Sequence, residues 1–335
     1  MNRRLLVHLD ADATIGLGHA VRTANLLHYL PDLEIVVSGQ GRALDEFFPT
    51  ARRVTPSRNA HDLAAIATRI KASGLLLDQP HMATQIATLR PSCTCPIAVI
   101  DDYGGIPSSD LIINGTILPA YHEYSAIRHN DRILAGGAYA LIHDAFACRS
   151  EEKATNSHRL LIVVGSDQRA FDWLDFLLAH FDGAAWDETT IVTGRAHPDP
   201  HRISSICSQR QIRHRHAISS EALAKETHRA KAALTTGGMI VYETLAAGLP
   251  VAAFPQINNL EAEMAHFAAQ GAIIDLGHQN GFQWSVVDQA LAILRHEPER
   301  RARMRQAGLN LIDGHGLRRA AKSLHELLRL NGGHA

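Results

Sequence analysis

The chain has 335 residues, more than one hydrophobic core usually serves, so two domains of roughly 150 residues each are expected. Hydrophobic residues make up 46% and charged residues 20%, which is the composition of a folded globular protein and excludes extended disorder. Lys and Arg total 33 against 34 Asp and Glu, so no overall positive field is available to hold nucleic acid or an anionic membrane.

The N-terminal sequence and the cysteines indicate a cytoplasmic protein. The apolar stretch that starts at Leu5 is interrupted by His8 and Asp10, too soon for a signal peptide. No apolar run approaches the roughly 20 residues of a membrane-spanning helix. Cys93 and Cys95 form a Cys-x-Cys pair without zinc-finger spacing, and the four cysteines are expected to be reduced structural thiols. We therefore expect no integral membrane segment and no bound metal.

In the first half, short apolar or β-branched runs alternate with segments of helical period, as in parallel βαβ units. Strands are predicted at residues 5–9, 34–38, 53–55, 75–78, 97–101 and 111–114, with helices that begin near residues 19, 43, 60 and 82. The stretch 147–157 has no apolar periodicity and is the predicted linker. It divides the chain into an N-terminal domain, 1–150, and a C-terminal domain, 151–335.

The second half repeats the pattern. Strands are predicted at residues 160–164, 190–193, 211–214, 232–235, 251–254 and 273–276, with helices between them. Residues 283–330 are expected to form two or three amphipathic helices. The sequence therefore predicts an α/β protein with two successive doubly wound, Rossmann-like domains.

The first candidate site lies between the first strand and the first helix, in the segment Asp10-Ala-Asp-Ala-Thr-Ile-Gly16-Leu-Gly18-His19-Ala-Val-Arg22. Its glycines let the backbone approach a ligand, and the free N–H groups of a helix start favour an anion. It is not the dinucleotide fingerprint, because no third glycine follows at the required spacing. His19 is a candidate general base, and the alternative is a histidine that only caps the helix.

The second candidate site is the segment Thr235-Thr-Gly237-Gly238-Met-Ile-Val-Tyr-Glu243, where a strand ends in glycines and a helix begins. This arrangement favours a phosphate at the helix start, with Glu243 one turn further on and within reach of ribose hydroxyls. The alternative is a tight turn followed by a surface glutamate.

Two further polar segments end strands of the second half, at Val164-Gly-Ser166-Asp167 and at Pro255-Gln-Ile-Asn-Asn259. The carboxyl ends of parallel strands meet at one edge of a sheet, so both segments should lie near the Gly237 turn. Three converging strand ends predict a ligand site on this half of the chain.

Taken in order, these segments resemble the UDP-sugar hydrolases of pseudaminic acid biosynthesis (PseG- and SpsG-like proteins). These are GT-B relatives of the lipid II N-acetylglucosaminyltransferase. The family pattern Asp-Ala-Ser-x-x-Ile-Gly-x-Gly-His-x-x-Arg is met from Asp10 to Arg22, except that Asp12 replaces Ser. The resemblance covers nearly the whole chain. The further matching segments are Ile100-Asp101-Asp102-Tyr103, Asn114, Gly136 to Leu141, Val164 to Asp167, and Gly238 to Glu243.

The resemblance implies a GT-B fold, in which two Rossmann-like domains face each other across a cleft. It also implies that the second half binds the UDP part of a UDP-sugar, that the sugar faces the first half, and that His19 activates water or a hydroxyl at the anomeric carbon. The candidate catalytic residues are His19, Asp101 and Asp102. The candidate substrate-binding residues are Gly16, Gly18, Arg22, Asp78, Asn114, Tyr139, Ser166, Asp167, Gly237, Gly238, Glu243 and Asn259. No cofactor is expected, and the protein should be a monomer or a weak dimer.

The departures from the family pattern lie mostly in the first half. Pro80 stands where the family has a functional tyrosine, and His143 stands where it has an arginine. Leu260 follows Asn259 where the family has glutamine. The substrate is therefore expected to differ from the family's. Three functions stay open: hydrolysis of a UDP-activated amino or deoxy sugar, glycosyl transfer on the same fold, and nucleotide-sugar binding without catalysis.

Overall fold

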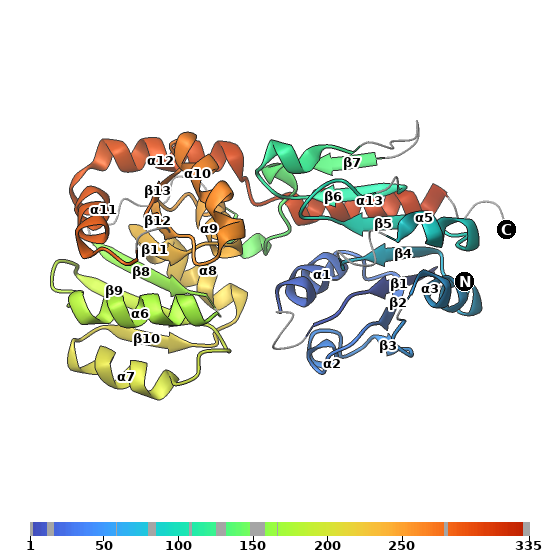
Figure 1. The fold of residues 1–335 in the computed structure, drawn as a ribbon, viewed down its shortest axis with the longest axis horizontal. Helices are drawn as coiled ribbons and strands as arrows, with labels where there is room; N and C mark the ends of the chain where they lie inside the picture. The colour runs from blue at the N-terminus through green and yellow to red at the C-terminus, as the bar shows by residue number, and fades with distance from the viewer. Residues whose placement is uncertain are drawn as a thin grey trace. The chain divides into compact units, whose positions relative to one another are not determined.

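The fold was analysed in a computed structural model, which describes residues 3–11, 17–57, 59–79, 85–106, 109–124, 132–147, 158–165, 167–277 and 281–330. The chain divides into two compact units (Figure 1). The first unit joins Met1–Leu141 to His315–Ala335, and the second is Ile142–Gly314. The boundary therefore falls after residue 141 instead of after residue 150, and the last helix belongs to the first unit. Of the predicted linker, residues 148–157 lie outside the described residues.

The first unit contains a seven-stranded parallel sheet in the order β3-β2-β1-β4-β5-β6-β7. Its strands are β1 (Arg3–His8), β2 (Leu33–Ser38), β3 (Arg52–Arg53), β4 (Gly74–Leu77), β5 (Ile97–Ile100), β6 (Leu111–Asn114) and β7 (Arg132–Ala135). The strand order reverses between β1 and β4. Such a reversal is a topological switch point, and α/β proteins bind ligands there, at the carboxyl ends of the strands. The ends of β1, β4 and β5 are therefore the expected location of a site.

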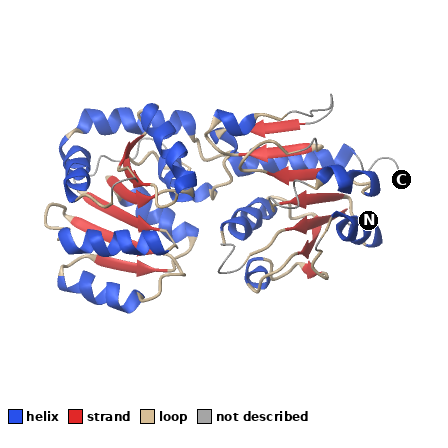
Figure 2. Cartoon of the chain, in the orientation of Figure 1, coloured by secondary structure: helices blue, strands red, loops and turns tan. Residues whose placement is uncertain are grey.

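Helices cover both faces of this sheet (Figure 2). The side chains of β1 alternate, so that Leu5 packs with residues of α1 (Gly18–His28), α2 (Ala43–Phe47) and α13 (Gly316–Leu330). Leu6 points to the opposite face and packs with residues of α3 (Ala60–Arg69) and α5 (Ile86–Leu89). Gly74 allows α13 to approach closely, because a Cβ at this position would lie 2.2 Å from Leu328 Cδ2. The apolar face of α13 is therefore part of the first core.

The second unit contains a six-stranded parallel sheet in the order β10-β9-β8-β11-β12-β13. Its strands are β8 (Arg159–Val164), β9 (Glu188–Thr193), β10 (Arg213–His216), β11 (Ala232–Thr236), β12 (Val251–Phe254) and β13 (Ile273–Asp275). The strand order reverses between β8 and β11, so both units have the doubly wound topology that the sequence predicts.

The second unit has its own hydrophobic core, centred on Trp173, whose ring stacks on Phe254 with centroids 5.7 Å apart. Its helices are α6 (Gln168–His180), α7 (Pro200–Gln209), α8 (Ser220–Arg229), α9 (Met239–Ala246), α10 (Glu261–Ala269), α11 (Trp284–His296) and α12 (Pro298–Leu311). The predicted C-terminal helices are confirmed as α11, α12 and α13. No helix among the described residues is both long enough and apolar enough to cross a membrane.

One strand of the structure was not predicted, one predicted strand starts later than expected, and one predicted helix lies partly outside the described residues. Strand β7, which the sequence analysis missed, is a short edge strand whose residues are all half-buried, so it has little apolar signal. Strand β10 begins at Arg213, two residues after the predicted start at 211. The helix expected near residue 82 falls on residues 81–84, which lie outside the described residues, and α5 begins at Ile86.

Candidate active site

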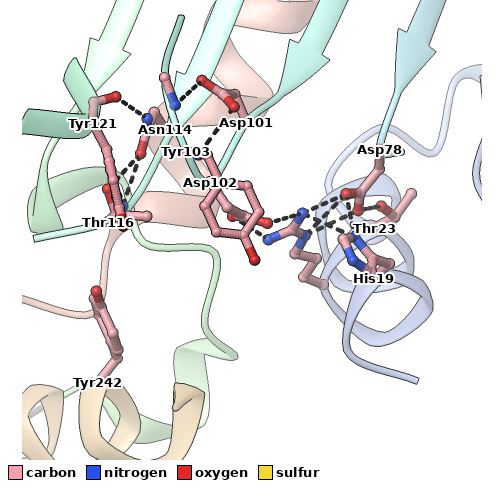
Figure 3. Close-up of polar contacts among 12 residues, drawn as sticks. His19, Thr23, Asp78, Asp101, Asp102, Tyr103, Asn114, Thr116, Tyr121 and Tyr242 are labelled. Carbon is pink, nitrogen blue, oxygen red and sulfur yellow. Dashed lines mark hydrogen bonds and ion pairs between the residues drawn. The ribbon is translucent and has the colours of Figure 1, made fainter. Parts of the chain in front are cut away.

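In the first unit, polar side chains converge where β1, β4 and β5 end (Figure 3). His19, Arg22 and Thr23 lie at positions i, i+3 and i+4 of α1 and therefore share one face of this helix. That face meets Asp78, directly after β4, and Asp102, which follows β5. The sequence predicted four of these five residues and missed Thr23, although its helical spacing from His19 was a usable signal.

His19 and Asp78 form a hydrogen-bonded pair, with the imidazole Nδ1 2.7 Å from Asp78 Oδ1. A carboxylate only accepts, so Nδ1 must carry the proton and donate it, and the unprotonated Nε2 is left as an acceptor. Thr23 Oγ1 donates to the other Asp78 oxygen at 2.6 Å. The Asp78 side chain is fully buried, whereas that of His19 is 24% exposed. The pair therefore combines a fixed, buried carboxylate with an accessible imidazole.

Arg22 holds both carboxylates of the cluster. Its Nε donates to Asp78 Oδ2 at 3.0 Å, and its two terminal nitrogens donate to Asp102 at 2.6 and 2.9 Å. One of these nitrogens also lies 3.0 Å from His19 Nδ1, which is a contact without a hydrogen bond because Nδ1 already donates to Asp78.

The electrostatics of the cluster keep Asp78 ionised. Burial by itself would raise the pKa of Asp78, but the Arg22 guanidinium and the hydrogen bonds from His19 and Arg22 hold that pKa well below its usual range. Burial by itself would lower the pKa of the Arg22 guanidinium, but the carboxylates of Asp78 and Asp102 raise it. Asp78 is thus a permanent anion beside the imidazole, in the position that stabilises a protonated histidine.

Asp101 has a structural role in this geometry, contrary to the expectation that it is catalytic. One of its oxygens accepts the backbone N–H of Tyr103 at 3.1 Å, and the other accepts the N–H of Gly104 at 2.9 Å and the hydroxyl of Tyr124 at 2.8 Å. Burial and the nearby Asp101 carboxylate raise the pKa of Tyr124, so this hydroxyl stays a donor. Both oxygens of Asp101 therefore accept hydrogen bonds from the turn after β5 and from Tyr124, and the carboxylate fixes this turn.

Asn114 belongs to the same structural network. Its amide nitrogen donates to the Tyr121 carbonyl at 2.7 Å and to the Tyr124 hydroxyl at 2.8 Å. Its amide oxygen accepts from the N–H and the hydroxyl of Thr116. The side chain is completely buried. The predicted substrate-binding role is therefore replaced by the support of the loop that follows β6.

The turn held by Asp101 presents Tyr103, which is 54% exposed, the highest value among the large apolar side chains of the described residues. Its ring lies edge-on to Tyr121, with centroids 5.9 Å apart. Tyr103 follows Asp102 directly, so an exposed aromatic face adjoins the charged cluster (Figure 3). The sequence analysis quoted Tyr103 only as part of a matched segment.

The remaining candidates of the first unit are Gly16, Gly18 and Tyr139. Gly18 begins α1, and a Cβ there would meet nothing within 4 Å, so space is open at the helix start. Gly16 lies outside the described residues. Tyr139 ends a short 3-10 helix, Gly137–Tyr139, whose backbone lies against Gly316 at the start of α13.

In the second unit, the predicted nucleotide site lies where β8, β11 and β12 end. The N–H of Gly165, directly after β8, donates to Oγ1 of Thr236, the last residue of β11, at 2.9 Å. This hydrogen bond links the ends of β8 and β11. Gly238 has a φ of +91°, which favours glycine, and begins α9 without a side-chain cap. The N–H groups at this helix start therefore point toward a free position suited to an anion.

The N–H of Gly237 is not available for that position. It donates to the Phe254 carbonyl at 2.8 Å and so extends the pairing of β11 with β12. The prediction that the Gly237 backbone N–H binds phosphate therefore does not fit the structure, and the prediction for Gly238 stays a prediction. A Cβ at Gly237 would lie 3.0 Å from Leu260 Cδ1 and 3.3 Å from Gln256 Oε1. Glycine at this position therefore lets the side chains of Leu260 and Gln256 pack closely against the backbone.

Glu243 and Gln256 are two incompletely satisfied polar groups beside this turn. Burial raises the pKa of Glu243 to about 8, and no hydrogen bond or ion pair to its carboxyl is recorded among the described residues. Gln256 is buried, and its Oε1 has no hydrogen-bond partner within the described part of the chain. Buried polar groups normally have partners, so Gln256 Oε1 marks a position where a polar ligand completes the hydrogen bonding, and Glu243 lies on the helix that begins at this turn.

Three other candidates of the second unit are not placed in this site by the structure. Asp167 caps α6 through a hydrogen bond from Ala170 N at 2.9 Å, which is a structural role instead of the predicted substrate contact. Ser166 lies outside the described residues. Asn259 belongs to the 3-10 helix Asn258–Leu260, and its side chain is not described.

Comparison with known proteins supports the fold and the resemblance. No protein-family model matches the sequence. The chain is SpsG-like over its full length: it is 23% identical over 332 residues to the spore coat polysaccharide biosynthesis protein SpsG of Bacillus subtilis strain 168, covering 96% of this chain and 97% of that protein. Acinetobacter baumannii MurG superposes with a TM-score of 0.69 at 11% identity, covering 97% of this chain and 99% of that one.

A second solved structure, the S. aureus MnaA–UDP co-structure, superposes with a TM-score of 0.61 at 13% identity, covering 98% of this chain and 97% of that one. At these identities the likeness shows the fold, and the predicted GT-B fold with two parallel Rossmann-like sheets is confirmed. The resemblance to SpsG-like proteins is confirmed as well.

Proposed function

We propose that the protein hydrolyses a UDP-activated amino or deoxy sugar to UDP and the free sugar. The observation that carries the proposal is the His19–Asp78 pair, in which a buried carboxylate fixes the tautomer of a partly exposed imidazole. Such a pair is the arrangement of a general base in many hydrolytic sites. The SpsG-like sequence and the GT-B fold agree with a role in polysaccharide biosynthesis.

In the proposed reaction, His19 Nε2 takes a proton from a water molecule while the water oxygen bonds to the anomeric carbon. The bond between that carbon and the β-phosphate oxygen breaks, and UDP leaves with the bonding electrons. The imidazolium that forms is stabilised by the ionised Asp78 and then returns its proton to solvent. Arg22 holds Asp78 in place throughout the step.

The second unit is proposed to bind the UDP part of the substrate. The start of α9, from Gly238 onward, offers N–H groups to the diphosphate and stabilises the charge that develops on the leaving group. Glu243 accepts hydrogen bonds from ribose hydroxyls, which would give its carboxyl the partners that it lacks. Gln256 Oε1 accepts a further hydrogen bond from the nucleotide.

Glycosyl transfer to an acceptor hydroxyl is the second candidate function. The same His19 Nε2 would take its proton from the acceptor instead of from water, with no other change in the chemistry. One observation favours it: the exposed Tyr103 beside Asp102 offers an aromatic face on which a second sugar ring can stack.

Incubation with a panel of UDP-sugars, with and without acceptor sugars, tests the proposal through the release of UDP. Release without an acceptor supports hydrolysis, and ¹⁸O from labelled water should then appear in the free sugar and not in UDP. Release only in the presence of an acceptor supports the transferase. Binding of UDP-sugar without release of UDP under either condition would contradict both proposals and favour a binding protein.

A further inference from the structure

Two cysteines of the first unit form a close pair at the amino end of β5. Cys93 and Cys95 follow the 3-10 helix Arg90–Ser92, and their sulfurs lie 3.4 Å apart. Residues i and i+2 of an extended chain direct their side chains to the same side, and Cys93 is extended, with φ −107° and ψ 110°. The active-site candidates lie at the opposite, carboxyl end of the same sheet, so the proposed hydrolysis makes no use of this pair.

The contact between the two sulfurs makes the thiols unequal. Either sulfur can donate in this contact. With Cys95 as the donor, the hydrogen bond lowers the pKa of Cys93 to about 7 against the effect of burial, with a smaller lowering by Arg90 and an opposing effect of Asp110. The same contact, together with burial, raises the pKa of Cys95. With this direction of the hydrogen bond, Cys93 is the thiol of the pair that ionises first. This is the division between an attacking and a resolving cysteine.

Arg90 supplies an independent sign of an anion at this position. It pairs with Asp110 through one terminal nitrogen at 2.8 Å. Its Nε and its other terminal nitrogen are buried and have no hydrogen-bond partner among the described residues. A guanidinium with unused buried donors next to a cysteine is suited to stabilise a thiolate. Its side chain is 27% exposed, so the pair lies close to solvent.

We propose that Cys93 and Cys95 form a redox-active dithiol site that hydroperoxides oxidise to an intramolecular disulfide. In the first step the Cys93 thiolate attacks the terminal peroxide oxygen, the S–O bond forms, the O–O bond breaks, and hydroxide leaves from hydrogen peroxide or alkoxide from an organic hydroperoxide. In the second step the Cys95 sulfur attacks the Cys93 sulfenic acid, the S–S bond forms, the S–O bond breaks and water leaves. The two sulfurs together lose two electrons to the peroxide. The spacing also fits a trivalent arsenical, which bonds to both sulfurs of a dithiol.

Cys207 is a control within the same chain. It is completely buried in the second unit, and burial raises its pKa to about 11. Cys93 and Cys95 are 6% and 9% exposed, so Cys207 differs from them both in exposure and in pKa. Formation of a Cys93–Cys95 disulfide while Cys207 stays reduced therefore reports on the pair.

The test treats the folded full chain with hydrogen peroxide and maps each cysteine by mass spectrometry. In the wild type we expect a disulfide between Cys93 and Cys95 that dithiothreitol reverses, with Cys207 still reduced. Iodoacetamide at pH 7 should label Cys93 about a hundredfold faster than Cys207, because the larger thiolate fraction of Cys93 outweighs the lower nucleophilicity of a thiolate with a lower pKa. Phenylarsine oxide at one equivalent should block labelling of both Cys93 and Cys95.

Variants separate the two roles. Cys95→Ser should stop at a Cys93 sulfenic acid, which dimedone traps, and Cys93→Ser should lower the rate of peroxide consumption about tenfold or more. Cys207→Ser should behave as the wild type. The proposal is overturned if native wild-type protein forms no link between Cys93 and Cys95, or if Cys93 and Cys207 react at equal rates. Because these wild-type measurements need no variant, a variant that fails to fold leaves the test intact.

Discussion

The Nδ1 of His19 lies 2.7 Å from the buried Asp78 carboxylate, and this single hydrogen bond determines which imidazole nitrogen is available to a substrate. Without it the imidazole could adopt either tautomer. With it, Nε2 is the acceptor, and a positive charge on the ring has a permanent anion beside it. The proposed function depends on this relationship, so the predictions begin with it.

Asp78→Asn should lower turnover by about a hundredfold to ten-thousandfold, because the neutral amide neither fixes the tautomer nor stabilises the imidazolium. The affinity for UDP, which we assign to the second unit, should not change. Asp102→Asn is the matched control: it also removes a partner of Arg22 but leaves the His19–Asp78 hydrogen bond intact, so its loss of turnover should be much smaller. Equal losses in the two variants would contradict the role of Asp78.

The UDP affinity should depend on the ionisation of Glu243. Burial raises its pKa to about 8 in the absence of ligand, and ribose hydroxyls that donate to it favour the ionised form. Binding must then release a proton below this pKa, so affinity should rise with pH between about 5 and 8 and level off above it. The measurement is titration calorimetry of UDP over this range of pH.

Glu243→Gln is the control for that dependence, because it leaves the titration of UDP itself, near pH 6, unchanged. Above pH 8 the variant should bind UDP roughly tenfold or more weakly, since a charge-assisted hydrogen bond contributes about 1.5 to 3 kcal/mol. If the UDP affinity of Glu243→Gln equals that of the wild type at every pH, Glu243 does not belong to the UDP site.

Asp101→Asn should reduce stability and preserve catalysis. Asparagine offers one acceptor and one donor where Asp101 accepts from three groups, so at least one of them loses its partner. The free energy of unfolding should fall by about 1 to 3 kcal/mol, measured in urea, while the turnover of the folded fraction stays within about threefold of the wild type. A folded variant that loses turnover by a hundredfold would return Asp101 to the catalytic residues.

The second unit should lose stability in acid through His214. Burial lowers its pKa to about 4, and the nearby His216 and His197 lower it further. Below its ordinary pKa of 6.5 the unfolded chain binds a proton that the folded chain does not, so stability should fall as pH drops from about 6.5 to 4. The loss should approach about 2 kcal/mol.

His214→Gln keeps an amide to replace the hydrogen bonds to Thr193 and Ser204 and should flatten this pH dependence. The exposed His201→Gln, from α7 of the same unit, should leave it unchanged. The measurement is the urea midpoint of unfolding of each protein at pH 4.5 and pH 7. An equal change of this midpoint with pH in wild type and His214→Gln would contradict the prediction.

Sequence predicted the fold well where burial leaves a strong pattern. The strands Gly74–Leu77 and Ile97–Ile100 are entirely buried and read as short apolar runs, whereas the half-buried edge strand Arg132–Ala135 does not. Division of the chain by sequence order put the last helix in the second half, whereas the family resemblance implies that it crosses back to the first domain, and the structure groups it with the first unit. Its apolar face, including Leu324 and Leu328, packs on the first sheet.

Sequence predicted the site less completely, because a polar residue after a strand end looks the same whether it binds a ligand or holds a loop. Asp78 and Asp101 both follow buried strands, yet only Asp78 faces the histidine, while Asp101 accepts from the turn behind it. The N–H of Gly237 was likewise assigned to a phosphate although it continues the sheet. The partners of Asp78 and of the Gly237 N–H are distant in sequence, so composition and spacing do not contain them, whereas Asp101 accepts from Tyr103 and Gly104, two and three residues further on.

The most direct test of the proposed hydrolysis is the turnover of His19→Asn with the best UDP-sugar of the panel, measured together with UDP affinity. If His19 is the general base, turnover should fall by about a hundredfold to ten-thousandfold while the dissociation constant of UDP stays unchanged. Asparagine can still cap a helix start, so a capping role predicts no loss of either quantity. A folded His19→Asn protein with wild-type turnover would contradict the central claim.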